Sequence, residues 1–276
     1  TYAPAQAGVA LVRWAWAETR SGTARVQARA AINRALALDS TLAEVQIVLA
    51  MVRAWLDWDW EGAEVAFRKA IEINPNYADA RAFYAGFLGV MERPEEARAQ
   101  MNRALELDPF NLMLRTMNGG YLHTERRYAE AIEELEAVLR IEPDHITAQV
   151  NLLWAYHDNG NYDEVLALAR TINPGDRELE EATDRGYSEG GYRAAMLRGA
   201  ETLAARPESA ELFSMQVAGT YAMAGERERT LEWLEIAYEA RHYVLPGFLS
   251  ASGFGPVPGD DPRYQALRRR MGLPER

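Results

Sequence analysis

The sequence predicts an all-α fold, a solenoid of about seven helix–turn–helix repeats closed by a short C-terminal docking segment. The first observation is a fixed period. Ala63, Phe67, Ala70 and Pro75 return 34 residues later as Ala97, Met101, Ala104 and Pro109. The second is that small and large residues share one helical stripe, which lets paired helices approach closely. The third is the proline after each stripe, because proline ends a helix.

The spacing and register of these positions resemble the tetratricopeptide repeat (TPR). The resemblance implies a right-handed superhelix in which the first helix of each repeat faces a concave groove. We place the TPR array at 1–244 and a C-terminal loop and capping helix at 245–276. The approximate repeats are 3–42, 43–77, 78–111, 112–145, 146–175, 176–210 and 211–244.

The composition argues against several classes of function and structure. The net charge of −11 argues against a general nucleic-acid binder, because phosphate contacts need a basic surface. The chain has no cysteine, which excludes disulfides and thiolate zinc sites and fits a reducing compartment, so we expect a cytoplasmic protein. No run of eighteen apolar residues exists, so no membrane span is predicted.

The first two repeats have irregular turns. About six additional residues surround Ser21-Gly22-Thr23, a loop insertion. The second turn holds Asp57-Trp58-Asp59-Trp60, in which we expect one tryptophan to cover the hairpin core and the aspartates to cap the next helix. A catalytic pair of Asp57 and Asp59 is the alternative, but no base or nucleophile accompanies them.

The middle repeats follow the period closely. Met91 to Pro94 forms the third turn, where Pro94 favours the start of a helix. Gly119 is predicted to let two helices approach closely. The fifth repeat turns at Asn159 to Tyr162 and ends early at Asn173-Pro174-Gly175, where we expect a local change of superhelical pitch.

The last part of the chain departs from the rule. Glu189 to Tyr192 is predicted as the turn of a degenerate sixth repeat, and the period ends after Tyr238. Leu245 to Gly259 is too rich in glycine and proline to be helical throughout. Asp261 is expected to cap a short helix that Gly272 stops.

This ending is similar to the tail of a group of bacterial multidomain regulators. The matching segments of the ending are Pro262–Leu267 and Arg269–Pro274. The same group also commonly shows the segments Asp57–Ala63, Asn74–Ala78 and Gly190–Arg193 of the repeats. In that group the TPR array follows a winged-helix DNA-binding, nucleotide cyclase or protein kinase domain. The resemblance implies the regulatory or sensory region of a larger bacterial signalling protein.

Two further segments bear on this resemblance. Thr1 to Pro4 repeats the junction at Asn76 to Asp79, so we expect the chain to continue a longer protein upstream. Phe254-Gly255-Pro256 departs from the group's usual Phe-Asp-Pro.

The TPR resemblance also implies which residues face the groove, namely four positions on the first helix of each repeat. The candidate binding residues are Trp14, Met51, Gly86, Gly120, His123, Trp154, His157 and Tyr187. We expect the glycines to leave room for another backbone and the large aromatic residues to anchor it. A protein or peptide is the predicted partner, the chain's own tail or a second copy included. A small-molecule sensor is the alternative use of the groove, and simple packing of Trp154 and Tyr187 between helices is the alternative to binding.

No cofactor, metal or catalytic residue is predicted. His123 and His157 fall one repeat apart in one column, but neighbouring helices stand roughly 8–10 Å apart and no third ligand is evident. The sequence has no Gly-rich phosphate loop and no HExxH motif. The run Arg268 to Arg270 suits the dipole at a helix C-terminus and does not by itself predict nucleic-acid binding.

Overall fold

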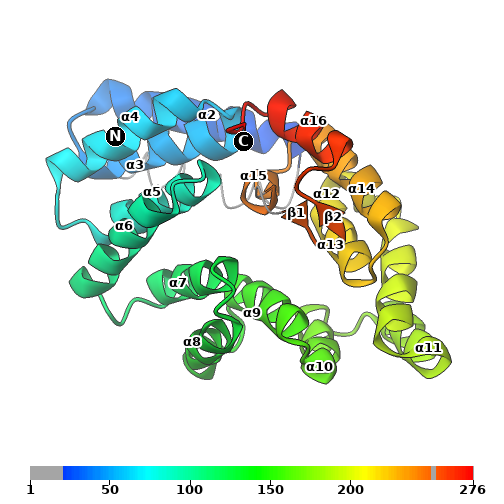
Figure 1. Cartoon of the computed structure of the whole chain (residues 1–276). Coiled ribbons are helices and arrows are strands. Elements are labelled where there is room, and N and C mark those ends of the chain that lie inside the picture. The colour runs from blue at the N-terminus through cyan, green and yellow to red at the C-terminus, as the bar shows by residue number, and fades with distance from the viewer. Residues whose placement is uncertain (1–20, 250–252, 276) are drawn as a thin grey trace.

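The computed structural model describes residues 21–249 and 253–275, and it confirms the predicted all-α repeat array (Figure 1). The helices of these residues are α2 Ser21–Leu38, α3 Ala43–Met51, η1 Val52–Asp57, α4 Trp60–Ile73, α5 Ala78–Val90, α6 Pro94–Leu107, α7 Leu112–Thr124, α8 Tyr128–Ile141, α9 Ile146–Asn159, α10 Tyr162–Ile172, α11 Arg177–Ala204, α12 Ser209–Leu212, α13 Ser214–Met223, α14 Arg227–Glu239, α15 Leu245–Phe248 and α16 Pro262–Arg270. Here η1 is a π-helical turn that continues α3. Two short strands, β1 Gly253–Phe254 and β2 Val257–Pro258, pair antiparallel.

Consecutive helices pack as antiparallel pairs. The pairs are α3 with α4, α5 with α6, α7 with α8, α9 with α10 and α13 with α14. The long helix α11 bends in the middle, because Gly190 and Gly191 leave helical geometry and Gly191 has a φ of 70°. This bend is the predicted turn of the sixth repeat. Among the described residues, no helix is both long and apolar enough to cross a bilayer.

The turn inside a repeat uses one residue in the left-handed region. Trp58, Glu92, Arg126 and Gly160 follow one another at 34-residue intervals, with φ of 57°, 56°, 60° and 84°. Glycine adopts this conformation without a Cβ clash, whereas any other residue is strained there by roughly 1–3 kcal/mol. Three successive turns therefore hold a strained residue where the fourth holds glycine.

Aspartate side chains cap the N-termini of two helices, as expected. The carboxylate of Asp59 accepts a hydrogen bond from the backbone N–H of Gly62. The carboxylate of Asp261 accepts hydrogen bonds from the backbone N–H groups of Arg263 and Tyr264. These bonds satisfy donors that have no partner inside the helix. The other turn aspartate, Asp57, does not cap a helix and forms an ion pair with Arg29 instead.

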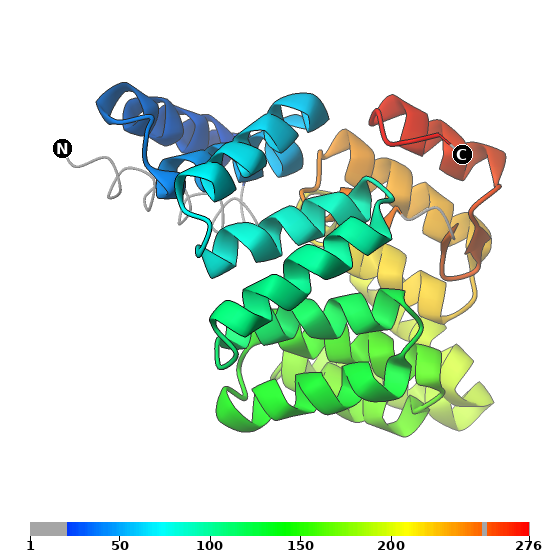
Figure 2. The ribbon, with the colours of Figure 1, turned by 60° about the vertical axis from the view of Figure 1, so that its left-hand side comes forward.

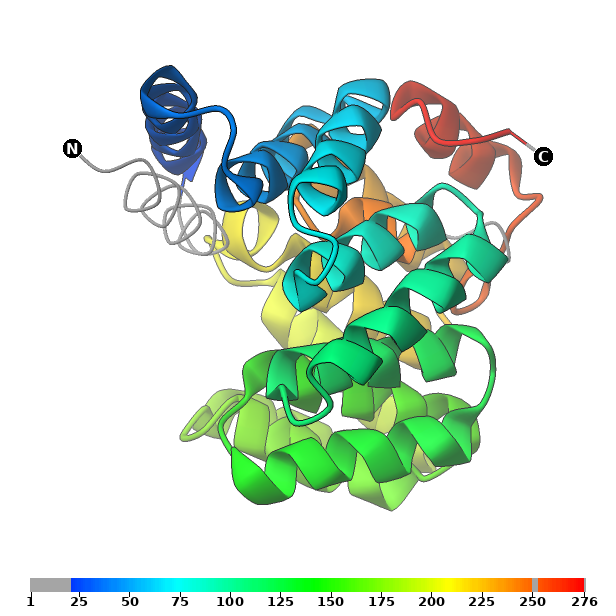
Figure 3. The same cartoon turned by 90° about the vertical axis from the view of Figure 1, so that its left-hand side faces the viewer.

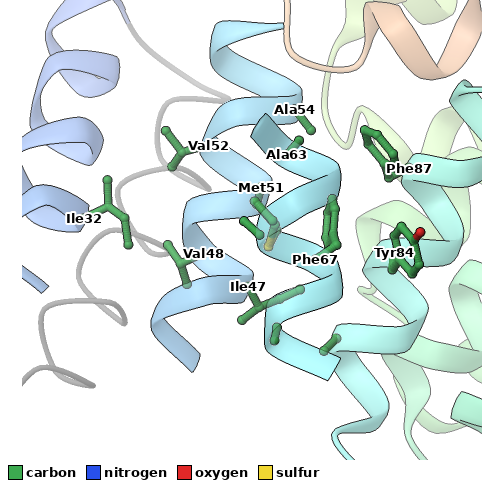
Figure 4. Packing of buried hydrophobic residues seen from close by; sticks show 14 of the residues in the cluster. Ile32, Ile47, Val48, Met51, Val52, Ala54, Ala63, Phe67, Tyr84 and Phe87 are labelled. Carbon is green, nitrogen blue, oxygen red and sulfur yellow. The ribbon is translucent and has the colours of Figure 1, made fainter. Parts of the chain in front are cut away.

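Aromatic and small residues fill the core between repeats. Figure 4 shows Phe67 of α4 facing Tyr84 and Phe87 of α5, and the ring centroids lie 5.6 and 5.4 Å from Phe67. Gly119 of α7 is buried where a Cβ would stand 2.5 Å from Cγ of Leu135 on α8. The prediction that this glycine permits close helix approach is confirmed.

The array curves, and the chain after α14 returns along its inner side. We call residues 245–249 and 253–275 the C-terminal segment. Its α15, β1 and β2 lie inside the curve of the array (Figure 1), and α16 packs against α14. Figures 2 and 3 show α16, in red, beside the end of a light-blue to cyan helix of the early repeats. The C-terminal segment thus joins the two ends of the curve.

Candidate functional site

Trp154 of α9 is covered by the C-terminal segment. Its ring centroid lies 5.3 Å from that of Phe254 and 6.1 Å from that of Phe248. The two phenylalanine rings meet edge to face at 5.4 Å. On another side Gly219 of α13 approaches the indole, since a Cβ there would stand 3.0 Å from a ring carbon. The chain's own tail, one of the predicted occupants, therefore contacts Trp154.

Gly255 lets β1 turn into β2 at this place. Its φ is 55°, and a Cβ on it would stand 2.6 Å from Cβ of Ala222 on α13. Any side chain would therefore be strained by the backbone and would also collide with α13. This explains why glycine fits between Phe254 and Pro256.

His157 lies one turn after Trp154 and belongs to an aromatic cluster. Its Nδ1 is 2.8 Å from the hydroxyl of Tyr192, and its ring meets Trp154 edge to face at 6.0 Å. Tyr162 stacks on Tyr192 with centroids 4.2 Å apart. Burial lowers the pKa of the His157 imidazole, with the nearby His123 acting in the same direction and Asp158 opposing it. Burial also raises the pKa of Tyr192. The hydroxyl and the imidazole are therefore both neutral at neutral pH.

His123 has its own partner on the next repeat. Its Nε2 is 2.7 Å from a carboxylate oxygen of Asp158, and its ring lies 5.5 Å from that of Tyr128. The two histidines thus make separate hydrogen bonds, to Asp158 and to Tyr192. Among residues 21–249 and 253–275, no group of three or more His, Cys, Asp or Glu could hold a metal ion.

Side chains of the next repeat lie beside the predicted glycines. A Cβ on Gly86 would stand 3.7 Å from Cε of Met117, and one on Gly120 would stand 3.2 Å from Nδ2 of Asn151. On Gly89 it would stand 2.9 Å from the hydroxyl of Tyr121. These side chains come from the first helix of the following repeat. At Gly89 and Gly120 the next repeat therefore places a side chain in tight contact, whereas at Gly86 a Cβ would make only an ordinary contact. The expectation that these glycines leave room for another backbone stays a prediction.

The other predicted residues are scattered. Met51 is 1% exposed and packs in the core of the first repeats, so it does not line an accessible surface. Tyr187 is 47% exposed, and its hydroxyl lies 3.4 Å from a carboxylate oxygen of Asp163. Tyr192, just after the bend of α11, is the tyrosine of this helix that contacts His157. Trp14 lies outside the described residues.

Arg268 makes buried contacts that the sequence alone did not predict. It looked like part of a solvated basic run, yet its side chain is 2% exposed. One terminal nitrogen donates to the carbonyl of Leu249, and the other donates to the carboxylate of Glu92 and, over 2.9 Å, to the carbonyl of Pro274. Helical spacing from Tyr264 places Arg268 on the apolar face of α16, and that phase was the available signal.

Further contacts join the C-terminal part of the chain to the second repeat. The indole nitrogen of Trp60 donates to the carbonyl of Met271 over 2.7 Å. The ring of Trp58 lies 5.4 Å from that of Tyr238, and the guanidinium of Arg241 lies 4.7 Å from the Trp58 ring centroid. Together with Arg268 and Glu92, these contacts close the curve of the array.

Comparison with known proteins agrees with this architecture. The family model described as "Tetratricopeptide repeat" matches residues 54–115 and 122–182. The match covers less than half of the chain, and the paired helices outside it continue the same all-α, TPR-type repeat array. No curated protein matches the sequence at a significant level.

Two of the solved structures compared with the chain share its fold at low identity. PilW, a widely conserved type IV pilus biogenesis factor, is 18% identical, with a TM-score of 0.52 over 86% of this chain and 92% of that one. A TPR protein from Parabacteroides merdae is 15% identical, with a TM-score of 0.53 over 91% of this chain and 93% of that one. YrrB, a TPR protein with an unusual peptide-binding site, is 19% identical with a TM-score of 0.42 over 78% and 95%.

Proposed function

We propose that this TPR array is a protein–protein interaction scaffold that binds a peptide or helix on its inner side, at α7 and α9. The observation that carries the proposal is the contact of Trp154 with Phe248 and Phe254. It supports the proposal because this side already holds a polypeptide segment through aromatic contacts. Large aromatic residues are effective anchors at protein interfaces.

Polar groups beside Trp154 add directional contacts. The side chains of His123 and Asp158 are 23% and 36% exposed, so both remain within reach of a partner. A carboxylate accepts several hydrogen bonds, and His123 uses one of them. The pair therefore suits a backbone N–H or a cationic side chain of a bound segment.

The binding test is a selection from a random peptide library, followed by titration of the selected peptides. We expect Asp158→Asn and His123→Ala to weaken binding by roughly tenfold, as the loss of one hydrogen bond to a charged group implies. Glu133, exposed on α8, provides the control, and Glu133→Ala is expected to leave affinity unchanged. Enrichment of no peptide, or equal binding by all variants, would contradict the proposal.

The finer part of the proposal concerns the protein to which the array belongs. We place it as the regulatory or sensory region of a larger bacterial signalling or transcription-regulatory protein. The similarity of Pro262–Leu267 and Arg269–Pro274 to the tail of such regulators supports this. The coding sequence upstream of Thr1 tests it: an effector domain in frame is expected, and a start codon at that point would remove the proposal.

A further inference from the structure

Two of the three strained turn residues have a second role. Trp58 contacts Tyr238 and Arg241, and the carboxylate of Glu92 binds Arg268. Arg126, the third, is exposed, and within the described residues no ion pair or ring contact joins it to the C-terminal segment. At Trp58 and Glu92 the strained turn coincides with a contact to the C-terminal part of the chain, whereas at Arg126 it does not. A strained backbone conformation can be retained because the side chain that it positions makes such a contact, and we apply this explanation to Trp58 and Glu92 only.

The buried ion pair between Glu92 and Arg268 holds an interface less favourably than apolar side chains would. Burying a guanidinium is costly, and apolar residues of similar volume often hold an interface at least as tightly. The buried Nε of Arg268 has no hydrogen-bond partner among the described residues, which adds to the cost. The Glu92 side chain is 23% exposed, so water reaches one end of the pair. These properties suit a joint that opens.

Arg268 connects the elements that would have to move together. It joins the turn of the third repeat, through Glu92, to the end of α15, through the carbonyl of Leu249. The hydroxyl of Tyr264 also donates to the carbonyl of Phe248 over 3.2 Å. Loss of the joint would therefore loosen α15, and α15 carries one of the two rings on Trp154.

We propose that the C-terminal segment is a latch: it closes the array through Glu92 and Arg268, and its release uncovers Trp154 for a partner segment that carries aromatic side chains. The partner must be aromatic because it replaces Phe248 and Phe254. The identity of the partner site rests on the proposed function, whereas the opening of the latch does not.

The absence of cysteine allows a direct distance measurement. Cysteines introduced by Glu95→Cys and Arg269→Cys, both at exposed positions, carry spin labels on either side of the joint. Glu92→Gly removes the carboxylate and leaves a residue that favours the turn, so a local folding defect does not explain its effect. Arg126→Gly is the matched control, with the same change at the same turn position one repeat later.

We expect a single short distance in the parent and in Arg126→Gly. In Glu92→Gly the distribution should broaden and extend by about 10 Å, the separation of packed helices. Glu92→Gln, which keeps the side-chain volume, should show the same direction. A parent-like distribution in both Glu92 variants would overturn the latch.

A second arm tests the partner chemistry with a synthetic peptide of residues 245–259. We expect it to bind Glu92→Gly more tightly than the parent, and to lose binding when its Phe248 and Phe254 are alanine. If distances lengthen but the peptide does not bind, the latch stands and the aromatic-partner assignment fails. Failure of the library selection alone would count against the proposed function and leave the distance result intact.

Discussion

At the scale of single residues, the left-handed turn position separates local stability from long-range contact. Gly160 adopts the left-handed conformation without strain, whereas Arg126, with a φ of 60° in the same region, adopts it at a local cost. Glu92 has that cost too, but its carboxylate reaches Arg268. One turn position in successive repeats thus serves two different ends.

Substitution of Arg126 by glycine should therefore stabilise the protein. Relief of roughly 1–3 kcal/mol of strain exceeds the roughly 0.5–1 kcal/mol of extra chain entropy that glycine loses. We expect a net gain of about 0.5–1 kcal/mol in the free energy of unfolding, measured by chemical denaturation. Gly160→Ala should lower the free energy of unfolding by about 1 kcal/mol, because its φ of 84° strains any residue with a Cβ. A Cβ there would meet no atom within 4 Å, so a steric clash would not add to this loss. A loss of stability in Arg126→Gly would show that its side chain has a stabilising role.

His157 should make stability depend on pH. Burial keeps the pKa of the folded imidazole below its usual value of about 6.5, so the unfolded chain binds a proton more readily. Its contribution is fully present above the usual pKa and is lost as pH falls toward the folded pKa. Between about pH 7.5 and pH 5, the melting temperature of the parent should fall more than that of His157→Gln. Equal slopes would assign the pH dependence to other groups.

Residues differ in how far the sequence predicts them. Asp59 and Asp261 could be predicted as caps, because a cap depends on residues within one turn. The register also gave the direction of Gly86 and Gly120, but not what fills the space beside them. The space beside them depends on Met117 and Asn151 of the next repeat, and the four groove-facing positions of each repeat do not describe contacts between repeats.

At the scale of elements, the helix pairs could be predicted because each pairing is local and recurs. The bend of α11 at Gly190 and Gly191 is the same kind of case. The contact of Arg268 with Glu92 joins residues 176 positions apart, and no local pattern records it. The contact of His157 with Tyr192 depends on the bend of α11, which decides which tyrosine of that helix reaches the imidazole.

The contact between α7 and α8 offers a test at this scale. Gly119→Ala places a Cβ 2.5 Å from Cγ of Leu135, so the buried Leu135 side chain or the two helices must move to admit it. Overpacking of this kind costs roughly 1–3 kcal/mol, which thermal or chemical unfolding would measure. Gly247→Ala is the control, because a Cβ there meets nothing within 4 Å. An unchanged stability in Gly119→Ala would mean that Leu135 or α8 moves aside without cost.

At the scale of the whole molecule, the C-terminal segment acts as a cap as well as a latch. Leu267, Met271 and Leu273 are each at most 3% exposed and belong to one cluster with α13 and α14. A repeat array needs its last apolar face covered to remain soluble. The segment therefore contributes to the core of the last repeat.

Truncation after Val244 should accordingly lower the melting temperature more than Gly119→Ala does. It should also increase binding of a hydrophobic dye, because the apolar face of α13 and α14 becomes exposed. Circular dichroism and dye fluorescence measure the two effects. A truncated chain that melts like the parent would show that the last repeat is stable without its cap.

The hydrogen bond from Trp60 to Met271 spans 211 residues in an array whose other pairings are mostly local. Local contacts form early in folding, whereas closing a long loop carries a larger entropic cost and comes late. We expect the repeats to assemble first and the C-terminal segment to close the curved array last, as a separate slow phase in stopped-flow tryptophan fluorescence. Glu92→Gly should slow or remove that phase alone. In this order of events, a chain emerging from the ribosome passes through an open array before the C-terminal segment closes it.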